Sequence, residues 1–528
     1  MMRVGLSDSA MDAQRLLRAA HAALARDDPQ SALDCLVQAS RRTPKDPRLH
    51  VSIGVVLQML QRPTDAEQAY NNALKVAPNN ANALLGLGSL RSELRQAPEV
   101  EELARRALLA DPANVKARLL LVRALQDQDK LVEAEEELVR TIKAHPSAAM
   151  PRTAFAGLLH DSGRFGEARE QFTKALELDP FNGQAYLGLV RTGTMTEGDR
   201  DLVGGLEKAL TNPSLDANSR TELLFCLGKA YDDLREYAKA MEQFSEANRL
   251  RELRLNRHRS ISHDGYNRLF DGIQNTFTKE SVAAQSAEDA GPPKPIFIVG
   301  MLRSGTTLAE QILTRHSSVA AGGEIDFWST EGLRCVDLDS STFDFNQALV
   351  ARKRYQKQLK AVAGGLPFAT DKMPDNYRML GVLAAMYPGA RIIHCVRHPV
   401  DTCLSIYFTP FRSPQDYFSD LEKLAFVYKR YQKLMAHWRA VLPAGSILDV
   451  HYGELIEDQE ATTRRMLAFC GLEWEDECLR PEDNTRAVKT ASAWQVRQPV
   501  YRSSLDRWRN YEPWIGPLAD LVRPEGPA

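Results

Sequence analysis

Small and apolar residues recur along the first half of the chain at one spacing, and they keep a common phase with a series of prolines. Regularly placed alanines let paired helices approach closely, because a small side chain leaves room between two backbones. The pattern therefore predicts a stack of helical hairpins with a period of 34 residues. The recurring positions are Ala32, Ala66, Ala134 and Ala168, then Ala39, Ala73, Ala107 and Ala175, and Pro44, Pro78, Pro112, Pro146 and Pro180.

Further positions keep the same register. Gly54 and Gly88 occupy the small site on the first helix of a hairpin, and Tyr70 and Phe172 occupy the large site on the second. In its period and in these positions the segment resembles the tetratricopeptide repeat family. We expect about seven hairpins over residues 13–254, with one degenerate unit after Pro180. Such a solenoid presents a concave face to a peptide or protein, or serves self-association, and the sequence leaves both open.

The period is lost over residues 255–293. A helix is expected over 266–277, and the Ala-, Gly- and Pro-rich stretch 283–293 has the composition of a surface linker. His258 and His263 are expected to be solvated rather than to bind a metal.

Short apolar runs alternate with helical stretches in the second half. Strands are expected over residues 295–299, 391–396 and 446–450. Apolar strands that alternate with helices predict a parallel sheet covered on both faces. The fold class is therefore a helical solenoid followed by a P-loop-like α/β domain over residues 294–522. Ligands of such domains bind at the carboxyl ends of the strands.

The first of these strands runs into a glycine-rich turn and a helix, Gly300-Met301-Leu302-Arg303-Ser304-Gly305-Thr306-Thr307. Backbone N–H groups and the positive end of the helix dipole make such a turn a phosphate site. The turn resembles a P-loop, but Thr306 stands where a nucleotide triphosphatase has lysine, and the cation is Arg303. The loop is predicted to bind a phosphate-type anion without splitting ATP.

A second motif follows the strand at 391–396. Arg397 ends the strand, Pro399 suits the opening turn of a helix, and Ser405 lies about two turns into that helix. If the strand end bends over the helix, Arg397 and Ser405 converge on one anion. The two motifs together predict two phosphate-like subsites in one sheet.

Composition limits the kinds of partner that the chain is expected to bind. The net charge of −2 and the pI near 6.6 give no electrostatic case for nucleic acid or an anionic membrane surface. The N-terminus has no apolar core of signal-peptide length, and no stretch approaches the roughly 20 apolar residues of a membrane helix. The seven cysteines are scattered, so we expect a cytoplasmic protein with reduced thiols.

The pairing of the two motifs resembles the sulfotransferase superfamily over about residues 294–520. The resemblance implies 3′-phosphoadenosine 5′-phosphosulfate as donor. No Walker-B-like acidic strand end is evident and the leaving group carries no triphosphate, so no metal is expected. The resemblance further implies that Arg397 and Ser405 hold the 3′-phosphate. The residues implied for the 5′-phosphosulfate are Arg303, Ser304, Gly305, Thr306 and Thr307.

Within the superfamily the chain resembles the protein-tyrosine sulfotransferases. The segment 370–376 lacks the catalytic histidine of the small-molecule enzymes, whereas Gly322-Gly323-Glu324 resembles the Gly-Glu of the tyrosine branch. The resemblance implies Glu324 as general base and Lys372 as catalytic lysine, with Tyr452 and Ser492 near the donor. The chain departs from that branch at Met301-Leu302, which replaces Val-Pro, and in the paired cysteines of the secretory enzymes, which are not recognisable.

These residue types suit sulfuryl transfer. Arg303 and Lys372 would stabilise charge on the leaving nucleotide, and Glu324 would take the acceptor proton. We expect a tyrosine of a peptide or protein as acceptor, presented by the repeats. Sulfation of a carbohydrate or another hydroxyl, an inactive interaction scaffold, and a nucleotide kinase or ATPase stay open, although the missing P-loop lysine disfavours the last. The basic and aromatic tail around Trp508 either lies over the nucleotide or forms a solvated helix face.

Overall fold

The computed structural model describes residues 8–26, 28–94, 96–213, 215–255, 261–411, 415–484, 497 and 505–522. The chain divides into two compact units, Met1–Leu158 with Glu170–Asp179, and Leu159–Arg169 with Pro180–Ala528. The division falls inside the helical repeats, so the last repeats belong to the same unit as the α/β domain.

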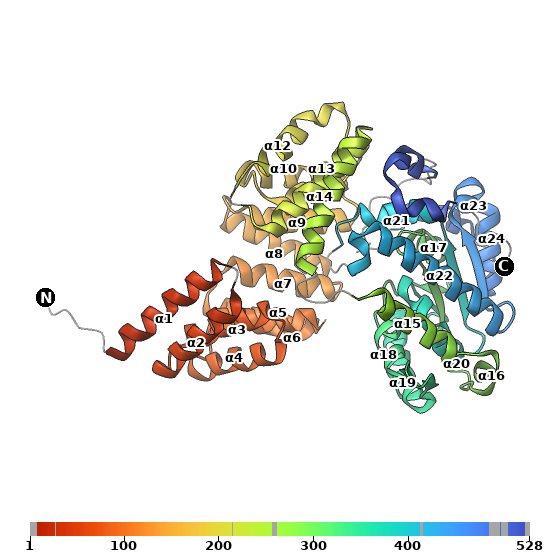
Figure 1. Cartoon of the computed structure of the whole chain (residues 1–528), viewed down its shortest axis with the longest axis horizontal. Helices are drawn as coiled ribbons and strands as arrows, with labels where there is room; N and C mark the ends of the chain where they lie inside the picture. Colours follow the sequence, from red (N-terminus) through yellow and green to blue (C-terminus); the bar gives the residue numbers. More distant parts are fainter. Residues whose placement is uncertain are drawn as a thin grey trace. The chain divides into compact units, whose positions relative to one another are not determined.

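Fourteen helices in the described ranges follow one another as seven pairs, as the period predicts (Figure 1). The first helices of several pairs begin at side-chain caps: the Asp46 side chain accepts from the Arg48 N–H, and Asn80 and Asn114 cap the next two first helices. The periodic prolines lie just after every second helix, where a helix cannot continue. The pairs are α1 (Asp8–Leu24) and α2 (Pro29–Arg42), α3 (Pro47–Met59) and α4 (Pro63–Val76), α5 (Ala81–Glu93) and α6 (Ala97–Ala110), α7 (Val115–Asp127) and α8 (Leu131–Ala144), α9 (Ala149–Asp161) and α10 (Phe165–Leu178), α11 (Gly183–Arg191) and α12 (Arg200–Leu210), and α13 (Ala217–Asp233) and α14 (Tyr237–Leu255).

The alternation of small and large residues packs these pairs. A Cβ added to Gly54 would lie 2.5 Å from the buried ring of Tyr70, which confirms the predicted pairing of a small and a large site. Gly88 faces Leu120 instead, and Gly86 supplies the second close approach to Tyr70. The degenerate unit after Pro180 has a first helix, α11, of only 9 residues.

The described part of the α/β domain contains a five-stranded parallel sheet, in the order β2-β5-β1-β6-β7. The three predicted strands are confirmed to within one residue. The two others escaped prediction because such short runs carry no readable period. Strand order reverses between β1 and β6, and the crevice at such a reversal is the usual ligand site. The strands are β1 (Lys294–Gly300), β2 (Val319–Ala320), β5 (Phe368–Asp371), β6 (Arg391–Val396) and β7 (Ile447–His451).

Helices cover both faces of this sheet. On one face Ile296, Ile298 and Ile393 pack against α17 and α24 in one buried cluster. On the other face the ring of Phe297 lies 6.4 Å from Tyr355 of α19. The helices are α15 (His263–Thr276), α16 (Lys279–Ala284), α17 (Thr306–Leu313), α18 (Trp328–Arg334), α19 (Phe345–Ala363), α20 (Leu380–Met386), α21 (Pro399–Tyr407), α22 (Leu421–Val441), α23 (Tyr452–Glu457) and α24 (Gln459–Cys470).

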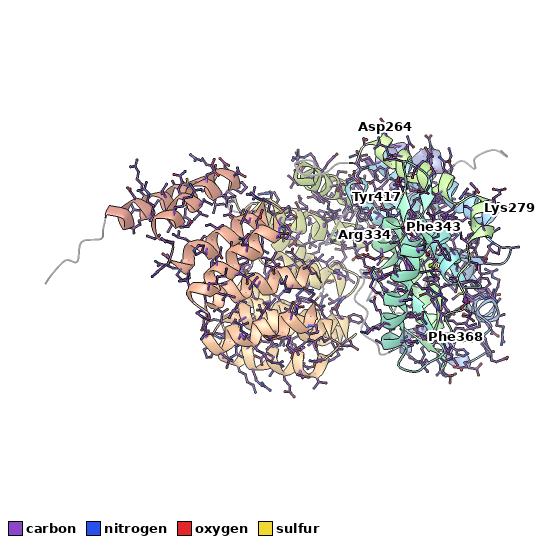
Figure 2. All side chains as sticks on the ribbon, turned by 90° about the horizontal axis from the view of Figure 1, so that it is seen from below. Asp264, Lys279, Arg334, Phe343, Phe368 and Tyr417 are labelled. Atoms are coloured by element: carbon purple, nitrogen blue, oxygen red, sulfur yellow. The ribbon has the colours of Figure 1, made fainter. Side chains whose placement is uncertain are left out.

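Short elements complete the described residues. The predicted helix over 266–277 is confirmed as α15, which contacts the domain at both ends. Its Tyr266 lies 6.1 Å from Tyr417, and the adjoining Phe277 lies 5.3 Å from Phe343; Tyr417 and Phe343 are labelled in Figure 2. The short elements are the hairpin β3 (Val336–Asp337) and β4 (Thr342–Phe343), and the 3₁₀ turns η1 (Glu197–Asp199), η2 (Pro374–Met379), η3 (Asp416–Ser419), η4 (Asp476–Leu479), η5 (Pro481–Asp483), η8 (Arg507–Trp514) and η9 (Gly516–Leu521).

The last repeat pair packs directly on the α/β domain within one unit. Phe244 of α14 stacks on Phe408 with ring centroids 4.2 Å apart. Asp232 of α13 is buried, forms an ion pair with Arg507, and accepts a hydrogen bond of 2.6 Å from the Tyr511 hydroxyl. The tail is therefore not a solvated helix face at Arg507 and Tyr511, because both are committed to this buried carboxylate.

All seven cysteines are free thiols, and six of them are buried. Burial raises the pKa of Cys395 to about 12, so its thiol stays protonated at neutral pH. None of the helices in the described ranges has the length and apolar character needed to cross a membrane.

Candidate active site

The glycine-rich turn has an unusual backbone. Between β1 and α17 the chain takes positive φ at Gly300 (148°), Arg303 (68°) and Gly305 (105°). Glycine adopts such angles freely, but arginine does so only where its surroundings hold it there. The Ser304 side chain is 2% exposed, and its hydroxyl has no hydrogen-bond partner among the described residues. A buried hydroxyl in this state is suited to bond a ligand.

The second motif lies beside this turn. Gly300 pairs with Cys395 across β1 and β6, which places Arg397 at the same sheet edge. Arg397 Nη1 donates to the Arg303 carbonyl at 3.3 Å, and Arg303 Nε donates to Ser405 Oγ of α21 at 3.0 Å. The structure thus brings Arg303, Arg397 and Ser405 together. Two cations gathered at one edge of the sheet favour a ligand with more than one negative charge.

Tyr452 contacts both motifs. It opens α23 directly after β7, and a Cβ added to Gly305 would lie 2.8 Å from its ring. The Arg397 guanidinium lies 5.2 Å from the centroid of the same ring. Tyr452 therefore packs against the turn and beside Arg397, and its contact with the donor stays a prediction.

Glu324 and Lys372 meet just beyond the carboxyl ends of the neighbouring strands β2 and β5. Lys372 Nζ donates to Glu324 Oε1 at 2.6 Å. The Lys372 side chain is 1% exposed, whereas that of Glu324 is 47% exposed. A buried ammonium thus orients a carboxylate that still faces solvent. The pair has the geometry of a positioned proton acceptor.

Beside this pair, Asp371 is fully buried. Tyr355 Oη donates to its Oδ2 at 2.7 Å, and Asn376 Nδ2 lies 3.3 Å from its Oδ1. Burial raises the pKa of Asp371 to about 8, and the negative charge of Glu310 adds to the rise. Asp371 is therefore largely protonated at neutral pH.

This protonation predicts a pH dependence of stability. The folded-state pKa lies above the ordinary value of 3.8, so the folded protein keeps a proton that the unfolded chain releases. The stabilising contribution is present below about pH 4 and is lost as pH rises through about 8, by up to about 1.4 kcal/mol per pH unit. Asp371→Asn removes this loss. Its melting temperature should gain on the wild type between about pH 5 and about pH 9; an unchanging difference would contradict a protonated Asp371.

A contact that the sequence did not single out lies between Glu310 of α17 and the Gly-Gly-Glu segment. The Glu310 side chain is buried, and its Oε1 accepts from the Gly323 N–H at 2.9 Å and from Thr370 Oγ1 at 2.8 Å. The available signal was an acid one turn before Leu313 in the apolar helix α17, where a buried carboxylate needs a reason.

The aromatic tail also reaches the second motif. Trp508 stacks on His398 with centroids 5.3 Å apart and planes 2° apart, and the backbone N–H of Trp508 donates to Asp401 Oδ1 at 2.8 Å. Ser492 lies outside the described residues. Within the described ranges no group of three or more His, Cys, Asp or Glu side chains is placed to hold a metal.

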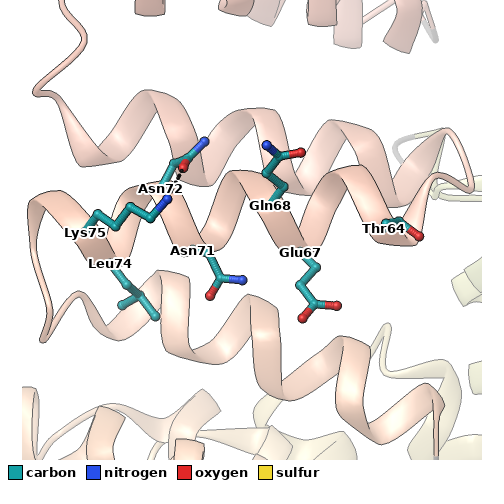
Figure 3. Close-up of a pocket in the computed structure, with 7 residues that line it drawn as sticks. All are labelled: Thr64, Glu67, Gln68, Asn71, Asn72, Leu74 and Lys75. Atoms are coloured by element: carbon teal, nitrogen blue, oxygen red, sulfur yellow. Dashed lines mark hydrogen bonds between the residues drawn. The ribbon is translucent and has the colours of Figure 1, made fainter.

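A separate hollow of about 730 Å³ lies on the repeat unit. All of its lining residues come from α4 (Figure 3), and Lys75 donates to Asn72 there at 3.4 Å. It contains amide and charged groups without a catalytic arrangement. The lining residues are Thr64, Glu67, Gln68, Asn71, Asn72, Leu74 and Lys75.

Comparison with known proteins matches different families to the first and second halves of the chain. The sulfotransferase family model matches residues 295–476, and tetratricopeptide repeat models match residues 17–81, 59–99 and 153–182. The chain therefore carries tetratricopeptide repeats followed by a sulfotransferase-family domain.

Individual relatives cover parts of the chain. An uncharacterized protein of Aquifex aeolicus (strain VF5) is 32% identical over 337 residues, which are 60% of this chain and 43% of that protein. Protein-tyrosine sulfotransferase 1 of Danio rerio is 26% identical over 241 residues, 40% of this chain and 65% of that protein. The chain thus spans less than two thirds of either relative. A tetratricopeptide repeat protein from Parabacteroides merdae is 19% identical, covering 46% of this chain and 93% of its own, with a TM-score of 0.35.

Proposed function

We propose that the α/β domain is an active sulfotransferase that moves the sulfuryl group of 3′-phosphoadenosine 5′-phosphosulfate to a hydroxyl acceptor. The observation that carries this proposal is the convergence of Arg303, Arg397 and Ser405 at one edge of the sheet. The Ser304 hydroxyl beside them has no partner among the described residues.

The residues fit a bisphosphate donor. The 5′-phosphosulfate would be held by the turn from Arg303 to Thr307, whose N–H groups open α17. The 3′-phosphate would be held by Arg397 and Ser405. The contact of Arg303 Nε with Ser405 Oγ makes the two subsites neighbours, as one compact nucleotide requires. Thr306 after Gly305 leaves no lysine for a β,γ-phosphate, which argues against ATP as the substrate.

The reaction would be an in-line displacement at sulfur. The acceptor oxygen forms a bond to sulfur while the bond from sulfur to the bridging oxygen of the donor breaks, and that oxygen leaves with the electron pair. Arg303 and Lys372 would stabilise the charge that develops there. Glu324, held by Lys372 and open to solvent, would take the acceptor proton.

For the acceptor we propose a tyrosine of a peptide or protein. Three observations support a tyrosine acceptor: the Gly-Gly-Glu segment, the pair of Glu324 with Lys372, and the 26% identity with protein-tyrosine sulfotransferase 1. The tetratricopeptide repeats favour a protein partner, either this acceptor or a second copy of the chain. A carbohydrate or other hydroxyl and an inactive nucleotide-binding scaffold are the alternatives.

A transfer assay tests this function. The protein is incubated with donor labelled in the sulfuryl group and a peptide that contains one tyrosine, with a tyrosine-to-phenylalanine peptide as control. Label on the tyrosine peptide alone supports a tyrosine acceptor. Label on a carbohydrate fraction of a cell lysate, with none on either peptide, would replace tyrosine by the carbohydrate alternative. No transfer to any fraction would favour the scaffold.

A glycine substitution tests the turn. Gly305→Ala should weaken binding of 3′-phosphoadenosine 5′-phosphate by about 10-fold or more, because φ is 105° and the new Cβ meets Tyr452 at 2.8 Å. Calorimetric titration measures this loss. Gly364→Ala is the matched control, since Gly364 also has positive φ (57°) but no atom within 4 Å of an added Cβ. Equal affinity in the two variants would remove the turn from the binding site.

A further inference from the structure

Helix α17 connects the two halves of the proposed active site. Its first residues, Thr306 and Thr307, end the anion-binding turn. Glu310 follows one turn later, at a rise of about 1.5 Å per residue, so it lies about 6 Å along the axis. A contact made by Glu310 therefore has a set distance from the turn.

That contact goes to the segment before the proposed base. Glu310 Oε1 accepts from the Gly323 N–H at 2.9 Å, one residue before Glu324. The same oxygen accepts from Thr370 Oγ1 at 2.8 Å, and Thr370 Oγ1 in turn accepts from the Gly322 N–H at 3.0 Å. Thr370 is fully buried and Glu310 is 4% exposed. One carboxylate oxygen thus serves both glycine amides, directly and through the hydroxyl.

The other side of the segment is held by β5. The Lys372 N–H donates to the Gly323 carbonyl at 2.9 Å, and its ammonium binds Glu324. A Cβ on Gly322 would lie only 2.0 Å from the Thr370 carbonyl, so the segment lies tightly against the strand. The segment is fixed by β5 on one side and by α17 on the other.

We infer that Glu310 is a positioning residue that ties the Gly322–Glu324 segment to the anion-binding turn through the rigid body of α17. The inference rests on the proposed function, in which Glu324 is the base. A proton acceptor must be held to within a fraction of an ångström of its productive place, and groups on one helix keep such a relation. Burying a carboxylate costs free energy that an apolar side chain avoids. Here one of its hydrogen bonds goes to the segment that carries the base, and the other reaches that segment through the Thr370 hydroxyl.

Two substitutions of Glu310 separate positioning from filling space. Glu310→Ala removes the acceptor for Gly323, whereas Glu310→Gln keeps an oxygen that can accept from both partners. Thr370→Val keeps the volume and removes the hydroxyl, and Thr370→Ser restores it. Ile312→Val, at a fully buried position on α17 that faces the sheet cluster, matches the loss of stability without touching the segment.

Three readouts are compared: hydrogen exchange of the amides at residues 321–325, turnover of the donor with the tyrosine peptide, and affinity for 3′-phosphoadenosine 5′-phosphate. Glu310→Ala and Thr370→Val should each raise exchange at Gly323 or Gly322 by about 10-fold and lower kcat by about 10-fold or more. The KM for the donor and the affinity for the bisphosphate should stay within about twofold. Glu310→Gln and Thr370→Ser should recover most of both losses.

Unchanged exchange in Glu310→Ala and Thr370→Val would overturn the inference, whatever the activity. Faster exchange with unchanged kcat would also overturn it, because the tie would then not position the base. Equal changes in exchange and kcat in Ile312→Val would show that the losses come from lower stability of α17, and would overturn the inference. Failure of the wild type to bind the bisphosphate would defeat the proposed function instead, and the exchange result would still judge the tie.

Discussion

Glu324→Gln is expected to lower turnover by about 10²-fold or more while leaving affinity for 3′-phosphoadenosine 5′-phosphate within about twofold. The amide keeps an oxygen that accepts the hydrogen bond from Lys372, so the segment keeps its place. It cannot take a proton from the acceptor. Single-turnover kinetics with the tyrosine peptide, together with nucleotide titration, measure the two effects separately.

Asp326→Asn is the matched control for this substitution. Asp326 is an exposed acid two residues further along the same segment, so its variant removes one negative charge without changing the pair of Glu324 and Lys372. We expect near-normal turnover. Retained turnover in Glu324→Gln would remove Glu324 from the mechanism, and equal losses in both variants would mean that the charge of the segment, not proton transfer, is at work.

Arg303→Met is expected to have the other large effect, a loss of both binding and turnover. Arg303 lies in the turn, and its Nε donates to Ser405 Oγ. Its backbone carbonyl accepts a hydrogen bond from Arg397. Loss of a charged hydrogen bond typically costs about 10-fold or more in affinity, and loss of a group that stabilises developing charge about 10²-fold in kcat. Methionine keeps the straight stem, which the left-handed backbone at φ 68° tolerates better than a β-branched side chain.

Two further variants test whether the loss in Arg303→Met is specific to the guanidinium of Arg303. Arg303→Lys should recover part of the affinity but not the planar, two-pronged contact. Arg315→Met removes a half-buried arginine just after α17 whose Nε donates to the Glu477 carbonyl, so this variant should bind nucleotide normally. Arg303→Met with wild-type turnover would contradict the assignment of Arg303 to the sulfuryl group.

The repeats and the central strands could be predicted because each rests on a local and repeated pattern. Close packing explains the small residues at positions such as Gly54, which the ring of Tyr70 leaves no room to enlarge. The strand before Gly300 is apolar throughout because helices cover both faces of its sheet. The turn between β1 and α17 could be predicted because glycine, arginine and a helix start follow one another in a fixed order.

The parts of the fold and of the site that could not be predicted depend on contacts between residues far apart in the sequence. The meeting of Glu324 and Lys372 requires β2 and β5, which are 2 and 4 residues long and show no period. Glu310 gains its place only when α17 packs beside these strands. Asp232 and Arg507 lie 275 positions apart, and their ion pair forms only because the last repeat pair packs on the domain. No local pattern encodes such pairs.

The most direct test of the proposed sulfotransferase is a calorimetric titration of the full chain with 3′-phosphoadenosine 5′-phosphate, with and without Mg²⁺ and ATP. The convergence of Arg303, Arg397 and Ser405 predicts tight binding of one nucleotide that is independent of Mg²⁺ and unaffected by ATP. Absence of binding, or binding that requires Mg²⁺ and is displaced by ATP, would contradict the donor site and with it the proposed function.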